Sequence, residues 1–208
     1  MTVRRPTYQT GGTLAEIGDA DILPAALYRD TNALTSGDET FPRLYGTNNA
    51  LTTATGSLRL TFFTAKRSFT TTQVCVPTGG TAAAATPTLC RIGLWTVDSS
   101  DNSVALVASV ANDTTLWASS NSRTSGTRSW SSSYSYVAGQ RYAIGVLVVT
   151  GAATPTFPGI TVATALQAIT ADAPRLSGIL ASQTDLPSSF TSAGLTTSVN
   201  VQYAQILP

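Results

Sequence analysis

Few side chains in this sequence could do chemistry, and those few are carboxylates, thiols and aromatic rings. The 208 residues include no histidine, which excludes Ser-His-Asp and Cys-His catalysis and histidine-ligated zinc. Two cysteines are too few for a Cys₄ zinc site, and no glycine-rich phosphate loop follows a strand and opens a helix. The sequence therefore predicts a protein that is not an enzyme and has no cofactor and no metal.

Only five carboxylates lie beyond residue 55, each within two residues of Pro, Ser, Asn or Thr: Asp98, Asp101, Asp113, Asp172 and Asp185. Asp favours turns because its side chain bonds to the nearby backbone, so we interpret all five as turn residues. Two of them in one cleft could hydrolyse a glycoside. A carbohydrate-active enzyme with a sandwich fold is therefore an alternative, which needs two carboxyls within about 10 Å of each other in a pocket.

The two cysteines, Cys75 and Cys90, flank a segment rich in Thr, Gly and Ala. If residues 74–76 and 89–91 are neighbouring strands, a disulfide would close a loop of about 15 residues and contribute roughly 3 kcal/mol. A reducing cytoplasm opposes that bond, and two buried thiols would pack as small apolar groups. The sequence leaves both alternatives open.

Aromatic rings in a polar setting form the last candidate group: Trp117, Trp130, Tyr134 and Tyr136. They lie in or beside residues 119–135, which consist mainly of Ser, Thr, Arg and aromatic residues. Aromatic faces stack on sugars, so these rings could bind a glycan or another subunit. For Trp117 and Trp130 the alternative is a satellite core, and Trp95, inside an expected strand, is assigned to the core.

The elements that must position these groups are strands. From Gly56 onward, runs of strand length alternate with period two and are bounded by turn-forming residues. This pattern predicts an all-β domain over residues 56–208, an antiparallel, jelly-roll-like β-sandwich. The hairpin loop is expected at residues 98–102, and the only helical candidate is residues 162–169. In the best strand the expected core face is Tyr142, Ile144, Val146 and Val148, with a close neighbour at Gly145.

Residues 1–55 differ in composition from the rest. Six acidic residues fall in the first forty positions, and the stretch up to Gly46 is rich in turn formers. Such a segment cannot bury much by itself, so we predict an N-terminal arm over residues 1–55 that docks onto a partner or a neighbouring copy.

Charged residues make up only 11% of the chain, against roughly 25% in average soluble domains. The net charge of +1 and the single lysine argue against a nucleic-acid partner. No apolar run approaches the roughly 20 residues of a membrane-spanning helix, and no signal-peptide pattern follows the first basic residues, so cytoplasmic synthesis is expected. Two uncharged rows predict a homo-oligomer: Thr70, Thr72, Val74 and Val76, and Ala143, Gly145, Leu147 and Val149.

The order of several short motifs resembles the minor tail proteins of actinobacterial siphophages. They include Phe62–Ala65, Ala82–Leu89, Arg91–Trp95, Asn112–Leu116, Ala138–Gly145, Pro174–Gly178 and Gln183–Pro187, with Ile206–Pro208 at the end. The resemblance covers roughly residues 56–208.

This resemblance implies a virion component with a β-sandwich head at the tail tip or on a fibre, made in the host cytoplasm. It also implies other virion subunits as partners, a homotrimer, and either host-surface glycan binding or a role in tail assembly. It supplies no catalytic residues. Similar modules that decorate the capsid or form head fibres are the alternative placement.

Overall fold

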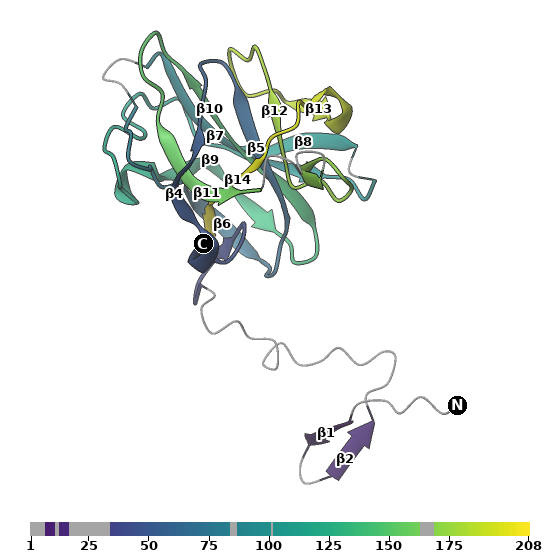
Figure 1. The fold of residues 1–208 in the computed structure, drawn as a ribbon. Coiled ribbons are helices and arrows are strands. Elements are labelled where there is room, and N and C mark those ends of the chain that lie inside the picture. The colour runs from purple at the N-terminus through teal and green to yellow at the C-terminus, as the bar shows by residue number, and fades with distance from the viewer. Residues whose placement is uncertain (1–6, 11–12, 17–33, 84–86, 101, 163–168) are drawn as a thin grey trace. The chain divides into compact units, whose positions relative to one another are not determined.

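The computed structural model describes residues 7–10, 13–16, 34–83, 87–100, 102–162 and 169–208 (Figure 1). The chain divides into two compact units, residues 1–33 and residues 34–208. In the first unit, β1 (Thr7–Thr10) pairs antiparallel with β2 (Thr13–Glu16). Within the described residues, no helix is long and apolar enough to cross a membrane.

The second unit is built from three antiparallel sheets (Figure 1). The largest has the order β12 (Ser177–Leu180), β5 (Leu58–Thr64), β10 (Arg141–Val149), β7 (Leu89–Val97), β8 (Ser103–Ser109) and β13 (Ser189–Thr191). The second contains β3 (Asp38–Glu39), β15 (Gln205–Leu207), β6 (Phe69–Cys75) and β9 (Thr127–Tyr136). The third contains β14 (Asn200–Gln202), β11 (Thr156–Thr161) and β4 (Thr47–Thr52). The sheets pack as a sandwich with a curled half-barrel, which confirms the predicted all-β antiparallel class.

The remaining regular elements described are single 3₁₀ turns: η1 (Arg43–Tyr45), η2 (Thr124–Gly126) and η4 (Ser192–Gly194). The helix expected over residues 162–169 lies almost wholly outside the described residues. The hairpin loop expected at residues 98–102 does join β7 to β8. Asp98 closes it, accepting hydrogen bonds from the backbone of Asn102 at 2.9 Å and of Ser103 at 3.0 Å.

The main core lies on the inner face of the six-stranded sheet. The predicted core face of β10 is confirmed, because Tyr142, Ile144, Val146 and Val148 are all at most 1% exposed. They pack in one cluster with residues of β6, β9, β11 and β15, including Val74, Trp130, Phe157 and Ile206. Each such side chain contributes about 1.5–3 kcal/mol by leaving water, so this cluster joins the sheets to one another.

The outer face of the same sheet is buried as well. Ala143 and Leu147 are fully buried in a second cluster with Leu58, Leu60, Phe62 and Trp95. Side chains from the later part of the chain pack over this cluster: Leu180, Leu186, Phe190 and Leu195. The uncharged row of β10 that predicted an interface between copies is therefore covered by this chain's own residues 180–195.

The other uncharged row is divided by a β-bulge. Between Thr71 and Gln73 the pairing advances two residues on β6 but five on β9, and an irregularity with an odd shift moves the following side chains to the opposite face. Consequently Thr70 and Thr72 are exposed, whereas Val74 and Val76 are fully buried in the main core. This row is not a continuous outer surface either.

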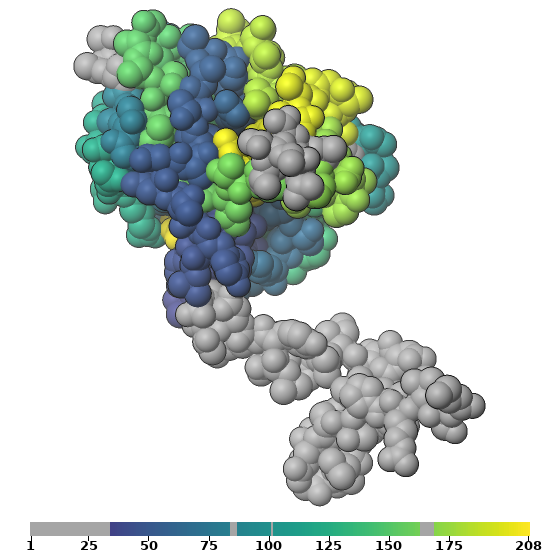
Figure 2. Space-filling model, viewed as in Figure 1, coloured from purple at the N-terminus to yellow at the C-terminus, as the bar shows by residue number. Residues whose placement is uncertain are grey.

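Residues 34–55 belong to the second unit, although the sequence analysis assigned them to the arm. The register pairs β3 with β15 and β4 with β11, and Leu51 of β4 is 2% exposed in the main core. Figure 2 shows the β4 segment, in blue, beside the green β11 segment on the molecular surface. Long-range pairing to strands more than 100 residues away orders this stretch, which local composition could not indicate.

A pair of glycines makes room for Trp95 in the outer cluster. Gly93 of β7 lies directly opposite Gly145 of β10, and a Cβ at Gly145 would lie 2.8 Å from Leu60 and 3.0 Å from the Trp95 ring. A Cβ at Gly93 would overlap the same ring. The indole occupies this space and donates a hydrogen bond to the Pro187 carbonyl at 3.0 Å. The close neighbour predicted at Gly145 is thus confirmed.

Adding one methyl group at this position should destabilise the fold. We expect Gly145→Ala to lower the free energy of unfolding by about 1–3 kcal/mol, as overpacking of a tight core does. Gly151→Ala is the matched control, because a Cβ there would meet nothing within 4 Å. Urea unfolding of the two variants checks this, and equal stabilities would contradict the packing described.

Candidate functional site

The two tryptophans proposed for a binding platform are core residues. Trp117 is 0% exposed and Trp130 is 6% exposed. Both indole N–H groups are satisfied internally, Trp117 by the Val76 carbonyl at 2.9 Å and Trp130 by the Thr71 hydroxyl at 3.0 Å. The core alternative therefore describes them, and neither ring face is available to a sugar.

The two tyrosines belong to the same interior. Tyr136 is 1% exposed and stacks on Tyr142 with ring centroids 4.6 Å apart. Its hydroxyl donates to the Asp38 carboxylate at 3.0 Å, and burial, followed by the charge of Asp38, raises the pKa of Tyr136. Tyr134 is half-buried and packs edge-on against Tyr142 at 6.2 Å. The four predicted rings therefore do not form an exposed aromatic surface.

Cys75 and Cys90 are both free and buried. The pairing that would have favoured a disulfide is absent, because β6 and β7 belong to different sheets. Burial, aided by the nearby charge of Asp113, raises the pKa of Cys90 to about 12, and burial also raises the pKa of Cys75. Since the thiolate is the reactive form, these thiols act as small core residues.

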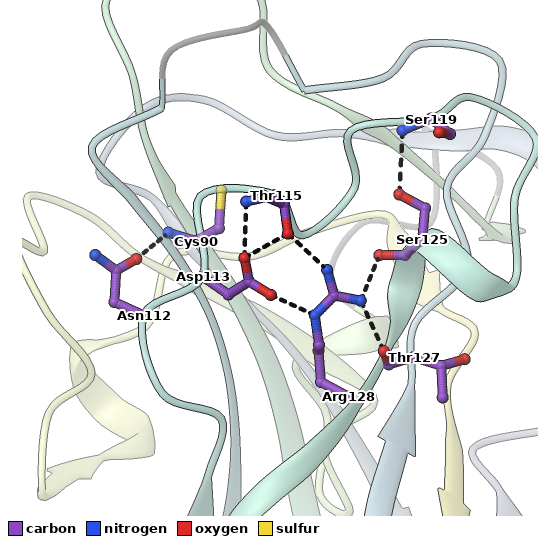
Figure 3. A network of polar contacts seen from close by, with 8 residues as sticks. All are labelled: Cys90, Asn112, Asp113, Thr115, Ser119, Ser125, Thr127 and Arg128. Atoms are coloured by element: carbon purple, nitrogen blue, oxygen red, sulfur yellow. Dashed lines mark hydrogen bonds and ion pairs between the residues drawn. The ribbon is translucent and has the colours of Figure 1, made fainter.

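An ion pair fixes the loop between β8 and β9 (Figure 3). One oxygen of Asp113 accepts hydrogen bonds from the amide and hydroxyl of Thr115 at 2.8 and 2.6 Å, and the other pairs with Arg128. Arg128 also donates to the carbonyls of Ser125 and Thr127, the latter at 2.7 Å. The guanidinium therefore joins both ends of the loop to the first residues of β9.

The same loop is tied to β7 by the neighbouring residue (Figure 3). The Asn112 side chain accepts a hydrogen bond from the Cys90 amide at 3.0 Å. Farther along, the Ser119 amide donates to the Ser125 hydroxyl at 3.1 Å. The motif at residues 112–116, which contributed to the family resemblance, is thus a loop-anchoring motif in this fold.

Acid should remove the contribution of this ion pair. Partial burial alone would raise the pKa of Asp113, but hydrogen bonds from Thr115 and Arg128 outweigh it and lower that pKa to about 2. A carboxyl group whose pKa is lower in the folded than in the unfolded state stabilises the protein at pH values above its ordinary pKa near 4. This stabilisation is lost as the pH falls to about 2. We expect Asp113→Asn to cost about 1–2 kcal/mol at pH 7, and this difference from the wild type should vanish near pH 2.

Urea unfolding at several pH values measures this difference. Asp185→Asn is the control, because Asp185 pairs with Arg91 at a side chain that is 57% exposed. Such surface pairs contribute about 0–1 kcal/mol. A cost for Asp113→Asn that stays constant down to pH 2 would show that the carboxylate charge is not responsible.

A shallow groove opens between β8 and β9. It is about 150 Å³ in volume and is lined by Leu106, Val107, Ala108, Ser109, Ser131 and Ser132. Enclosed ligand sites usually measure about 300–1,000 Å³. The groove lining contains no titratable side chain, so the groove offers a mainly polar surface that includes serine hydroxyls but no acid or base.

Of the five carboxylates beyond residue 55, three have structural partners, and Asp172 is exposed at a bend. Asp98 closes the β7–β8 hairpin, Asp113 binds Arg128, and Asp185 binds Arg91. Among the described residues, no three His, Cys, Asp or Glu side chains gather where a metal ion could bind. Asp101 lies outside the described residues.

Two acidic residues that the sequence analysis placed in the arm are instead the most buried charges described. Asp38 is 3% exposed and Glu39 is 2% exposed. Besides Tyr136, Asp38 accepts hydrogen bonds from the amide of Glu39 at 2.8 Å and that of Lys66 at 2.7 Å. β3 pairs with β15 in the sheet. The contacts of Asp38 also hold β3 against Lys66 in the β5–β6 connection and against Tyr136 of β9.

Glu39 extends this anchor toward the C-terminal strand. Its carboxylate accepts a hydrogen bond from the Tyr203 hydroxyl at 2.9 Å and lies 3.7 Å from Arg43. Gln205 donates to the same hydroxyl at 2.7 Å and accepts from Arg123 at 3.1 Å. Charged and polar groups from distant parts of the chain thus secure the start of the second unit.

Alkali should weaken this anchor. Burial raises the pKa of Tyr203 to about 12; the Gln205 hydrogen bond opposes the rise and Glu39 adds to it. A hydroxyl group whose pKa is higher in the folded than in the unfolded state stabilises the protein at pH values below its ordinary pKa near 10. This stabilisation is lost as the pH rises to about 12. We expect Tyr203→Phe to flatten the fall in unfolding free energy between pH 10 and 12. Tyr45→Phe, at a side chain 67% exposed, should leave that slope unchanged.

Next to the anchor, apolar side chains face solvent. Leu44 and Tyr45 are each 67% exposed, more than any other large hydrophobic residue described. They stand on η1, whose turn is closed by the Tyr45 amide bonding to Pro42 at 3.0 Å. We call these two residues, with the basic side chains Arg43, Lys66 and Arg67, the junction patch.

The three basic residues contact the same short segment. Arg43 lies near Glu39, the Lys66 ammonium donates to the Glu39 carbonyl at 3.5 Å, and Arg67 donates to the Thr35 carbonyl at 3.2 Å. Sequence reasoning missed this site because it treated residues 34–55 as part of a weakly apolar arm. The signal available was the three large apolar residues Phe41, Leu44 and Tyr45, which follow two acidic residues within a few positions.

No protein-family profile matches the chain, and no curated protein matches it either.

Proposed function

We propose that this chain is a structural subunit of a phage virion, of the minor tail protein type, that works by binding other proteins. The observation that carries the protein-binding role is the junction patch, where Leu44 and Tyr45 are exposed on a turn that buried charges hold in place. Tyrosine and arginine are the residues that most often dominate binding energy at interfaces. The virion assignment is supported by the resemblance of the motifs over residues 56–208.

The polar chemistry of the described residues supports a non-catalytic role. The ion pairs and buried carboxylates tie strands and loops together, and both cysteine thiols are buried. The groove between β8 and β9 is shallow and has no acid or base in its lining. A carbohydrate-active enzyme would need a cleft with two facing carboxyls, so we assign no reaction to this chain.

Between the two tail roles, assembly is better supported than glycan binding. The rings chosen as a sugar platform are buried or half-buried, whereas the junction patch is exposed. One observation still favours a glycan role, namely the uncharged, serine-lined groove. If the groove binds sugar, Ser132→Arg should abolish binding to host cell-wall polysaccharide while the fold is retained, and calorimetry would measure this.

Locating the protein in the particle tests the proposal. Mass spectrometry of purified virions should detect the chain, and gold-labelled antibodies raised against residues 34–208 should mark the tail. Labelling of the capsid would instead support a decoration or head-fibre protein. Absence of the chain from purified particles would overturn the virion proposal.

A further inference from the structure

The junction patch has the features of a surface that another chain covers. Leu44 and Tyr45 are consecutive in sequence and two-thirds exposed, and η1 gives them a defined geometry that costs little entropy on binding. The other large exposed hydrophobic residues described, Val137, Ile169 and Leu176, are each less than half exposed. This end of the sandwich is therefore where an apolar contact would remove the most surface from water.

The charges around the patch indicate the chemistry of the partner. The carboxylates of Asp38 and Glu39 are turned into the protein and are at most 3% exposed, while the Arg43 side chain is 43% exposed and Lys66 is exposed. An incoming surface thus meets the cations and not the anions. Electrostatic complementarity then requires a partner that carries carboxylates together with apolar side chains.

This chain itself contains a segment of that composition. Positions 16 to 30 contain four acidic residues, Glu16, Asp19, Asp21 and Asp30. They contain one basic residue, Arg29. Apolar residues alternate with them, among them Ile17, Ile22, Leu23 and Leu27. By contrast, the five carboxylates beyond residue 55 are scattered over more than 80 positions. No other part of the sequence combines acidic and apolar residues so densely.

We propose that residues 16–30 of one copy bind the junction patch of a second copy and so join copies of the chain into a homo-oligomer. The proposal rests on the protein-binding role proposed above and names the partner. Residues 1–33 and residues 34–208 are two compact units of the chain. Because the two contacting surfaces differ, the contact is heterologous, and it forms a closed ring of copies where the rotation between neighbours allows closure.

Light scattering of the purified full-length protein tests this interface. The wild type should be oligomeric at tens of micromolar, whereas Leu44→Ser/Tyr45→Ser and a chain lacking residues 1–33 should be monomeric. Val137→Ser is the matched control, because Val137 is an exposed hydrophobic residue, at 49%, outside the patch. Circular dichroism must show that every variant keeps the β-sheet spectrum.

Charge exchange tests the pairing itself. Lys66→Glu/Arg67→Glu should weaken self-association by about tenfold or more, and adding Asp19→Lys/Asp21→Lys should restore it. A monomeric wild type up to near-millimolar concentration would overturn the proposal, and so would oligomers that do not respond to the patch variants. A monomer whose melting temperature follows the charge exchange would show that the segment binds its own copy instead. None of these results depends on where the protein lies in the virion.

Discussion

The burial of β7 and β10 on both faces is the constraint on which the rest of this structure depends. One face packs into the main core and the other into the outer cluster around Trp95. A strand pair buried on both sides consists mainly of apolar residues and tolerates little variation in volume. This explains the Gly93–Gly145 pair, the apolar run of β10, and the need for residues 180–195 to cover the outer face.

Much of this architecture could be predicted from local patterns. Period-two alternation predicted the strands and the Tyr142 face of β10, and turn-forming residues predicted the turn at Asp98. All three could be predicted because they depend on residues that are close in the sequence. Features set by distant contacts could not be predicted. The uncharged outer face of β10 has the same sequence pattern whether another copy or the chain's own C-terminal part covers it. The bulge at Thr71 depends on the pairing of β6 with β9.

The same limit applies to the candidate sites. Trp130 lies among serines and has the local pattern of an exposed ring, yet its partner is Thr71, 59 residues away. Asp38 has the local pattern of an arm residue, although Tyr136 binds it from 98 positions along the chain. Residue types indicated which groups are polar or aromatic, and only the pairing of strands determined which of them are buried.

Once these structural roles are assigned, the most exposed large apolar residues described, Leu44 and Tyr45, lie on one turn beside three basic side chains. We propose that this end joins the protein to its neighbours. The most direct measurement is competition during infection, in which wild-type and Leu44→Ser/Tyr45→Ser chains with distinct tags are co-expressed with a phage lacking its own copy. The tag ratio in purified particles should strongly favour the wild type, although both chains are folded in the lysate. Equal incorporation of the two chains would contradict the account.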